Sequence, residues 1–290
     1  MLIGNAPCSW GVFYPTGNAL GGEAYLDAVA RAGYHATELG PLGFLPADTA
    51  VLRDALARRG LTLAGAAHVH VLTQAGSWPV LQAALDALGP ILARLGAPHL
   101  ALMDESEAYP AEAPGVTDAA GWRAMIDLVR RAHAHMREAH GVALTFHPHV
   151  GTCVEREDQI DRLLAETEVD LCFDTGHHAF WDQDPIAYMR KAWDRIGYIH
   201  LKNVDPAVRA RVLSGTLGPN ESFAAGVMAP LPDGAVDIAG VVRLMRERAY
   251  DGPCVVEQDP STDPAAEPPE ALAVRNRLFL ERLLAAGDAA

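Results

Sequence analysis

Eight short apolar runs alternate with segments of helical periodicity along this chain, and this alternation constrains the fold more than any other feature. We expect strands at 2–7, 34–39, 61–67, 99–103, 142–146, 170–173, 196–201 and 254–256. Strands that alternate with helices predict a parallel sheet with helical crossovers. Eight such units in 290 residues predict a closed (β/α)8 barrel, a single domain over residues 1–290. A doubly wound open sheet is the alternative, but no glycine-rich phosphate loop follows any run.

Helical periodicity fills most of the connections between these strands. The expected helices span 24–32, 51–59, 78–95, 122–139, 156–166, 185–193, 236–248 and 271–285, with a short one at 222–227 inside the long connection 206–232. Gly33, Gly60 and Gly96 directly follow three of these helices, as helix-ending glycines commonly do. Pro90 lies inside the third helix and predicts a kink or break, because proline lacks the backbone N–H.

The charge and cysteine content narrow the possible partners and compartment. With 23 basic and 37 acidic residues the formal net charge is -14, which argues against nucleic acid and membrane surfaces, since both need a basic face. We expect neither a signal peptide nor a membrane span, because no apolar run approaches ~18 residues. Four cysteines lie far apart without a CxxC pair, so we expect free thiols and a cytoplasmic protein.

Polar side chains gather where the expected strands end. In a barrel of parallel strands, all carboxyl ends lie around one mouth. The histidines and carboxylates at these ends are His68, His70, His147, His149, His177, His178, His200, Glu38, Asp174 and Glu257. Any one of them alone is more often a hydrogen-bonded bystander than a ligand, but their recurrence over several strands favours a common site.

Asp174 permits two interpretations, because it directly follows a buried apolar run. A carboxylate at such a place is costly unless something pairs with it. It could cap a helix that begins there, or it could bind a divalent metal. Mixed Asp, Glu and His donors favour Mn²⁺, Co²⁺, Mg²⁺ or Zn²⁺, whereas no cysteine stands where a thiolate zinc site would need it.

Three of the strand-end segments resemble the motifs of the xylose isomerase-like TIM barrels. They are DTGH at 174–177, IHLK at 199–202 and VE at 256–257. That superfamily includes sugar isomerases, epimerases, dehydratases and endonuclease IV. The resemblance implies one divalent metal ion, with Mn²⁺ or Co²⁺ preferred, held by Asp174, His200 and Glu257. His147 stands where the superfamily usually has Glu, so either it is the fourth ligand or strand five contributes none.

A narrower set of segments is similar to inosose dehydratases, enzymes of myo-inositol catabolism. The segments are NAPCSWGV at 5–12, HPHVGT at 147–152, LKNV at 201–204, GV at 226–227 with PDG at 232–234, and VVEQDP at 255–260. This similarity covers the chain nearly end to end. It implies a metal-dependent hydro-lyase that acts on a small cyclitol or sugar.

An inosose is a cyclic polyol with one ketone, and the resemblance implies chemistry at its acidic α-hydrogen. Removal of that proton gives an enediolate that a metal can stabilise, and loss of the β-hydroxyl then gives a dione. Return of a proton would instead give isomerisation or epimerisation. As groups that move protons we expect Glu38, His70, His177 and Lys202, without assigning acid or base. As groups that hold substrate we expect Trp10, His68 and His149, although Trp10 could also cap the core.

Other functions fit the sequence less well than dehydration. A sugar or inosose isomerase or epimerase would use the same metal site. A nuclease of the endonuclease IV type conflicts with the acidic chain, which lacks a basic stripe for DNA. A non-catalytic binding protein has no need for so many ionisable groups at one face. A homo-oligomer is compatible with the sequence.

Overall fold

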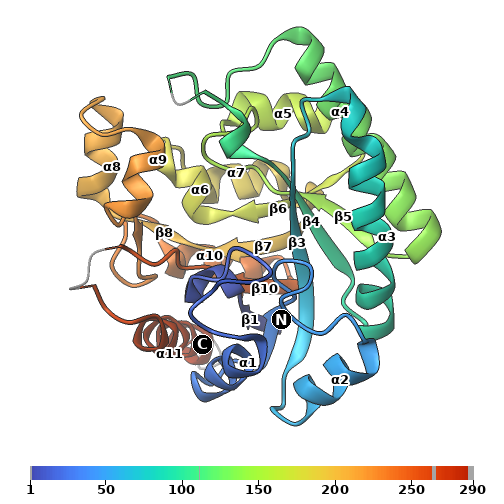
Figure 1. The fold of residues 1–290 in the computed structure, drawn as a ribbon. Coiled ribbons are helices and arrows are strands. Elements are labelled where there is room, and N and C mark those ends of the chain that lie inside the picture. The colour runs from blue at the N-terminus through green and yellow to red at the C-terminus, as the bar shows by residue number, and fades with distance from the viewer. Residues whose placement is uncertain (1, 111, 263–265, 287–290) are drawn as a thin grey trace.

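The computed structural model describes residues 2–110, 112–262 and 266–286. Within this part of the chain, eight parallel strands close into a barrel in the order β1-β10-β7-β6-β5-β4-β3-β2 (Figure 1). The strands are β1 (Leu2–Asn5), β2 (Ala36–Glu38), β3 (Thr62–His70), β4 (His99–Asp104), β5 (Ala143–Phe146), β6 (Asp170–Asp174), β7 (Ile196–Leu201) and β10 (Pro253–Val256). The predicted (β/α)8 barrel is therefore confirmed.

Helices surround the barrel, and α11 packs beside α1 so that the first and last helices meet (Figure 1). The helices are α1 (Gly22–Arg31), α2 (Thr49–Ala57), α3 (Trp78–Leu95), α4 (Ala119–His135), α5 (Glu157–Glu166), α6 (Thr175–Phe180), α7 (Pro185–Ala192), α8 (Pro206–Leu213), α9 (Pro219–Ala224), α10 (Ile238–Glu247) and α11 (Pro269–Ala286). A π-helical segment, η4 (Met136–His140), extends α4. None of the helices in the described residues is both long and apolar enough to cross a bilayer.

Helix α3 runs through Pro90 as one element, so the break that this proline predicted is absent. Leu85 and Leu88 before the proline and Ile91 and Leu92 after it are all buried. Packing of both halves against the barrel outweighs the backbone hydrogen bond that proline cannot make.

The connection after β7 contains more structure than its sequence predicted. Helices α8 and α9 and a small antiparallel sheet, β8 (Asn203–Val204) with β9 (Met228–Ala229), occupy most of it. A capping signal for α8 was present in the sequence: the side chain of Asp205 accepts from the backbone of Ala207 and Val208, and Pro206 is the first helical residue. Helix α6, also unexpected, begins directly after β6.

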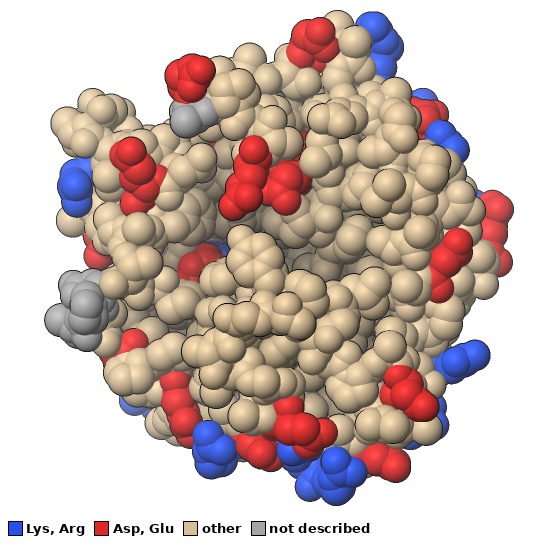
Figure 2. Space-filling view, in the orientation of Figure 1, with Lys and Arg blue, Asp and Glu red and all other residues tan. Residues whose placement is uncertain are grey.

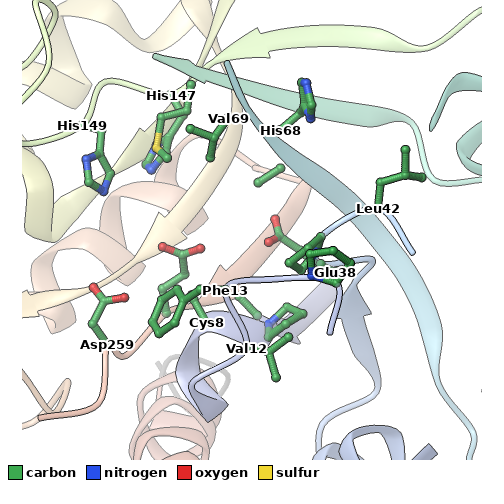
Figure 3. Close-up of a pocket in the computed structure, with 18 of the residues that line it drawn as sticks. Cys8, Val12, Phe13, Glu38, Leu42, His68, Val69, His147, His149 and Asp259 are labelled. Carbon is green, nitrogen blue, oxygen red and sulfur yellow. The ribbon is translucent and has the colours of Figure 1, made fainter. Parts of the chain in front are cut away.

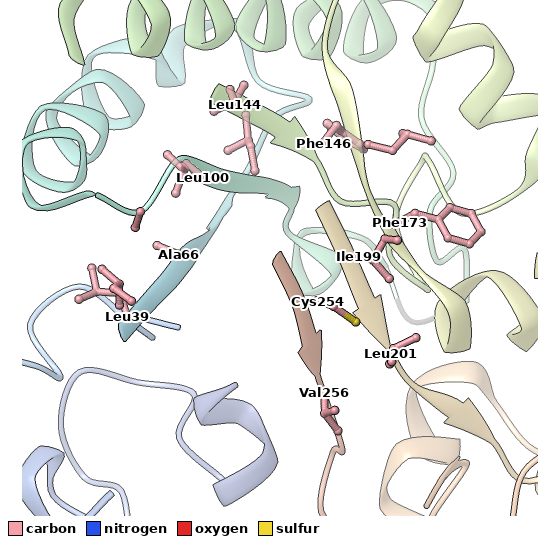
Figure 4. Packing of buried hydrophobic residues seen from close by; sticks show 14 of the residues in the cluster. Leu39, Ala66, Leu100, Leu144, Phe146, Phe173, Ile199, Leu201, Cys254 and Val256 are labelled. Carbon is pink, nitrogen blue, oxygen red and sulfur yellow. The ribbon is translucent and has the colours of Figure 1, made fainter. Parts of the chain in front are cut away.

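Two apolar cores hold the barrel. Between strands and helices lies a large core, in which the side chains that face outward from the strands, such as Leu144, Phe173 and Ile199, are buried (Figure 4). The core inside the barrel consists mostly of small side chains. Its buried residues are Ala6, Ala36, Ala64, Ala101, Cys172, Tyr198 and Val255. Tyr198 is its one aromatic side chain within the described residues, and Gly65 leaves room for that ring, since a Cβ there would lie 3.2 Å from it.

Candidate functional site

A cavity of about 350 Å³ opens among the carboxyl ends of the strands (Figure 3). Figure 2 shows a hollow near the middle of this face, while most charged side chains in view lie toward the periphery. The ionisable residues that line the cavity are Cys8, Glu38, His68, His147, His149, Lys202, Glu257 and Asp259. Six of these had been selected from the sequence as site residues, so the structure brings together groups from distant parts of the chain.

Asp174 caps a helix, as one of its two interpretations predicted, and its second oxygen stays available for the other, metal binding. Its Oδ1 accepts hydrogen bonds from the backbone N–H of Gly176 at 2.7 Å and of His177 at 2.8 Å, which caps α6. Its Oδ2 is buried and accepts no hydrogen bond. Burial raises the pKa of Asp174 to about 6, against the opposing charge of Lys202. A carboxylate oxygen in this situation is suited to a positively charged partner.

Asp174 and three buried side chains around it offer metal-binding atoms close together. The candidate ligand atoms of His147, Asp174, His177 and Glu257 all lie within 4.8 Å of one another. Nδ1 of His147 lies 3.3 Å from the carbonyl oxygen of Cys172. With its proton on that nitrogen, His147 keeps a lone pair on Nε2, which is the usual arrangement of a histidine ligand. The donor set and the unpartnered Asp174 oxygen therefore fit a borderline divalent ion.

His200 belongs to a second group that shares Glu257 with the first. Its Nε2 lies 3.0 Å from Oε1 of Glu38, and its Nδ1 lies 3.4 Å from Oε1 of Glu257. Burial by itself would lower the pKa of His200, but Cys172, Glu257 and Glu38 raise it well above its usual value. As arranged, His200 lies between two carboxylates, and its Nδ1 is buried without a hydrogen bond. A metal would bind this nitrogen through its lone pair, in the form that carries no proton there.

Lys202 is buried in the wall of the cavity rather than pointing to solvent. Its Nζ lies 2.9 Å from Oε2 of Glu257, 2.9 Å from Oδ2 of Asp259 and 3.8 Å from Oδ2 of Asp174. Burial opposes its charge, but Asp259, Glu257 and Asp174 together raise its pKa well above the usual value. The ammonium group also lies 3.1 Å from Nε2 of His177. The cavity thus contains a buried ammonium group held by three carboxylates.

Asp259 and Tyr198 are functional neighbours that the sequence did not single out. Asp259 follows Glu257 by two residues, a spacing that in extended chain directs both side chains to one side. That signal was available. Tyr198 lies inside the barrel and donates its hydroxyl to Oε1 of Glu38 at 2.6 Å, so with His200 it fixes this carboxylate. No local pattern distinguishes Tyr198 from a core tyrosine.

His149 is a neutral acceptor in the same cavity. Its Nδ1 lies 2.8 Å from the carbonyl oxygen of Val150, so Nδ1 carries the proton and Nε2 keeps a lone pair. Burial and then the charge of Lys202 lower the pKa of His149 to about 4. Its ring lies 4.0 Å, centroid to centroid, from that of His177. At neutral pH this side chain can therefore accept a proton or a hydrogen bond.

Five expected site residues do not line the cavity itself. Asp174, His177 and His200 still contact residues of its wall, and Trp10 and His70 are the other two. The Trp10 side chain is in the core, packs edge-on against Tyr25, and donates its indole N–H to Oδ1 of Asn5 at 2.6 Å. The structure thus places Trp10, the last residue of the 3-10 turn Pro7–Trp10, in the core, as its alternative interpretation had it, and not in the cavity lining. His70 follows His68 on the same side of β3, but two residues advance a strand by about 6.6 Å, which carries it past the cavity.

The lining of the cavity combines polar and apolar side chains. We call His147, His149, Lys202, Glu257 and Asp259 the polar wall, and Val12, Phe13, Leu42 and Val69 the apolar wall. Figure 3 shows His147, His149 and Asp259 on one side, with Leu42 and His68 across from them, while Val69 lies beside His147 and Phe13 beside Asp259. Phe13 is 52% exposed. Glu38, from β2, also lines the cavity.

Comparison with known proteins places this chain in a family. The family model for the xylose isomerase-like TIM barrel matches residues 26–283. Inosose dehydratase of Geobacillus thermodenitrificans is 28% identical over 291 residues, which cover 96% of this chain and 95% of that protein. The rhizopine catabolism protein MocC of Rhizobium meliloti is 33% identical over 253 residues, covering 82% and 75% of the two chains.

A solved structure has the same fold. The crystal structure of the IOLI protein with a bound zinc atom superposes with a TM-score of 0.74 at 12% sequence identity, covering 99% of both chains. At this identity the likeness concerns the fold.

Proposed function

This chain belongs to the xylose isomerase-like TIM barrel family, and on that premise we propose that it is a divalent-metal-dependent inosose dehydratase. The end-to-end similarity to inosose dehydratases supports the reaction and its cyclitol substrate. The observation that carries the proposal is the buried cluster of Asp174, Glu257, His147 and Lys202 beside a cavity of about 350 Å³. A cavity of that size suits one ring-shaped polyol.

We assign the metal to His147, Asp174, His200 and Glu257, with Mn²⁺ or Co²⁺ preferred over Mg²⁺ and Zn²⁺. His147, Asp174 and Glu257 belong to one compact group, and His200 faces Glu257. When bound, such an ion would act as a Lewis acid toward substrate oxygens that gain negative charge. His177 is the rival fourth ligand. Metal content of His200→Gln and His177→Gln decides between them, because only the true ligand's variant loses the ion.

The residues of this chain divide the proton transfers between the two sides of the cavity. Glu38, a carboxylate fixed through one oxygen by Tyr198 and His200, takes the proton from the carbon next to the ketone. The Lys202 ammonium, which belongs to the polar wall, gives a proton to the β-hydroxyl, which leaves as water when its C–O bond breaks. His149 accepts a hydrogen bond from a substrate hydroxyl through Nε2. The enol that remains becomes a dione.

The test of the reaction is to incubate metal-loaded protein with an inosose and follow mass and ultraviolet absorbance. Loss of one water with a new dione band supports the proposal. Products of unchanged mass would assign the protein to the isomerases or epimerases instead. If no inosose were turned over, the proposed substrate would be wrong.

The role of Glu38 is tested in D₂O, where the base exchanges the α-hydrogen of the substrate with solvent. Glu38→Gln should lose both dehydration and this exchange, by about 10²–10⁴-fold, since positioned bases contribute that much. Thr37→Ser, its neighbour in β2, is the matched control and should retain both. If Glu38→Gln exchanged the α-hydrogen at the wild-type rate, Glu38 would not be the base.

We also propose that the protein acts in the cytoplasm without nucleic acid or membrane partners. All four cysteines are free, which suits a reducing compartment. The net charge of -14 disfavours polyanionic partners. Fractionation of cells that express the tagged protein would test the location.

A further inference from the structure

Another group of metal-binding side chains, separate from those beside the cavity, lies in the outer helical layer, on α3, α4 and η4. It consists of Asp86 on α3, His135 at the end of α4 and His140 at the end of η4, whose ligand atoms lie within 4.8 Å of one another. Nε2 of His135 lies 2.7 Å from Oδ1 of Asp86, and Nε2 of His140 lies 3.5 Å from the same oxygen. None of the three lines the cavity at the barrel mouth.

The π-helical segment η4 is what brings the two histidines together. In a regular α-helix, residues five apart point about 140° away from each other, because each residue turns by about 100°. A π-helix closes i to i+5 hydrogen bonds, so its wider turn places residues five apart on nearly the same side. The rings of His135 and His140 accordingly lie 5.5 Å apart, centroid to centroid.

A missing side chain on α3 makes space for His140. A Cβ added to Gly89 would lie 2.3 Å from ring atoms of His140, so only glycine permits this ring to lie against α3. His140 is only 13% exposed, and its Nε2 is buried without a hydrogen-bond partner. A glycine in the middle of a helix costs about 1 kcal/mol relative to alanine. Its presence is explained if the position of this imidazole matters.

We propose that Asp86, His135 and His140 bind a borderline divalent transition metal, with Zn²⁺ as the best match, at a site separate from the one in the barrel mouth. Two imidazole nitrogens and one carboxylate oxygen are a common protein ligand set for zinc, and water takes the fourth position. Ligand atoms at about 2.0–2.1 Å from a tetrahedral ion lie about 3.3 Å apart. The 3.5 Å between Nε2 of His140 and Oδ1 of Asp86 already fits this value. The 2.7 Å between Nε2 of His135 and the same oxygen can widen, because the Asp86 side chain is 51% exposed and free to move.

An ordinary ion pair explains the group less completely. Asp86 and His135 alone could form one, with His135 donating the proton. That pair leaves the buried Nε2 of His140 without a hydrogen bond and with only a 3.5 Å approach to the Asp86 oxygen that His135 already occupies, which is costly. A metal would engage all three side chains, and it would cross-link α3 to the end of α4. The site therefore acts as a clamp in the helical layer outside β3–β5 rather than in the reaction.

The first test is the stoichiometry of Zn²⁺ binding to the metal-free full-length protein by calorimetry. Wild type should bind one more ion than Asp86→Asn and His140→Gln. His133→Gln, which changes a histidine of α4 outside the group, is the matched control and should bind as wild type does. Equal stoichiometry in wild type and His140→Gln would overturn the proposal.

A second test separates this site from the one at the mouth. In the Asp174→Ala background, Co²⁺ should still give the visible absorption of a bound ion, and Gly89→Ala should abolish it by displacing His140 without removing a ligand. Asp86→Asn should leave dehydratase turnover within about twofold, since it lies outside the active site. If the mouth binds no metal, wild type should still bind one ion that Asp86→Asn removes. Absence of Co²⁺ binding in both Asp174→Ala and wild type would overturn the proposal.

Discussion

The polar and apolar walls of the cavity are both built from repeats of one strand–helix unit. They differ in whether they bury charged groups. The polar wall buries charges, and it can do so because Lys202 offsets Glu257 and Asp259 at 2.9 Å each. An isolated charge there would be far more costly. The apolar wall has no such network and presents Val12, Phe13 and Leu42. In the function that we propose, the polar wall performs the chemistry and the apolar wall positions the ring.

The largest expected effect is on the polar side, at Asp174. Asp174→Ala should lose the mouth metal and at least about 10³-fold in turnover, because a Lewis acid contributes several kcal/mol. It should also lose about 1 kcal/mol of the free energy of unfolding as the α6 cap disappears. Metal analysis and denaturation measure the two effects separately.

Asp184→Ala is the matched control for this experiment. Asp184 caps α7 in the same way, accepting from the backbone of Ile186 at 2.9 Å and Ala187 at 3.1 Å, away from the cavity. It should lose similar stability and keep metal and turnover. Equal metal content in Asp174→Ala and Asp184→Ala would show that Asp174 is only a cap.

Lys202→Met should reduce dehydration by about 10²–10⁴-fold, since it removes the proposed proton donor. Metal content should not fall, because a positive charge that competes with the ion for Glu257 is gone. Exchange of the α-hydrogen in D₂O should persist, in contrast to Glu38→Gln. The control is Lys191→Met, which breaks a surface ion pair with Asp161. Near-normal dehydration in Lys202→Met would exclude the lysine as the acid.

On the apolar side, His68 should make the protein sensitive to acid. Burial lowers the pKa of His68 from 6.5 to about 4. The unfolded chain therefore binds the proton more readily, and the free energy of unfolding declines as pH falls from about 6.5 toward about 4. In His68→Gln this decline should be smaller by about 2 kcal/mol near pH ~5. Urea denaturation at several pH values, with the exposed His35→Gln as control, measures it; parallel curves for all three proteins would contradict it.

Phe13→Ala should weaken substrate binding rather than chemistry. We expect KM to rise about tenfold with kcat within about twofold, as for loss of contact area that the ground and transition states share. Tyr14→Ala is the matched control, because Tyr14 is 64% exposed and does not line the cavity. A fall in kcat with unchanged KM would mean that the apolar wall takes part in the chemical step.

The smallest effect is expected at Trp10 and His70, which belong neither to the cavity lining nor to the buried metal-binding groups beside it. His70→Gln should keep kcat/KM within about twofold of wild type, which is ordinary for a substitution remote from substrate. Trp10→Phe should cost about 1 kcal/mol of stability through the lost bond to Asn5, with similar turnover. Steady-state kinetics and thermal unfolding measure both. A tenfold loss of activity in either variant would restore its place in the site.

Local periodicity was enough to predict the barrel and much of the site. Apolar runs and helical spacing depend on neighbouring residues, so the positions of the barrel strands, for example Ile196–Leu201, could be read directly. Because all parallel strands present their carboxyl ends at one mouth, the residues that follow them could be placed together. Asp174, with its following Gly176, also carried a local capping signal.

The sequence by itself therefore determined the architecture and the face where chemistry would gather, whereas the tertiary structure decided which groups touch. Tyr198 contacts Glu38 although 160 residues separate them. The compact grouping of His147 and Glu257 with Asp174, and the contact of His200 with Glu38, depend on the stagger of the strands. The depth of each side chain along its strand also excluded His70. These distances arise from closure of the barrel, a property that no single segment contains.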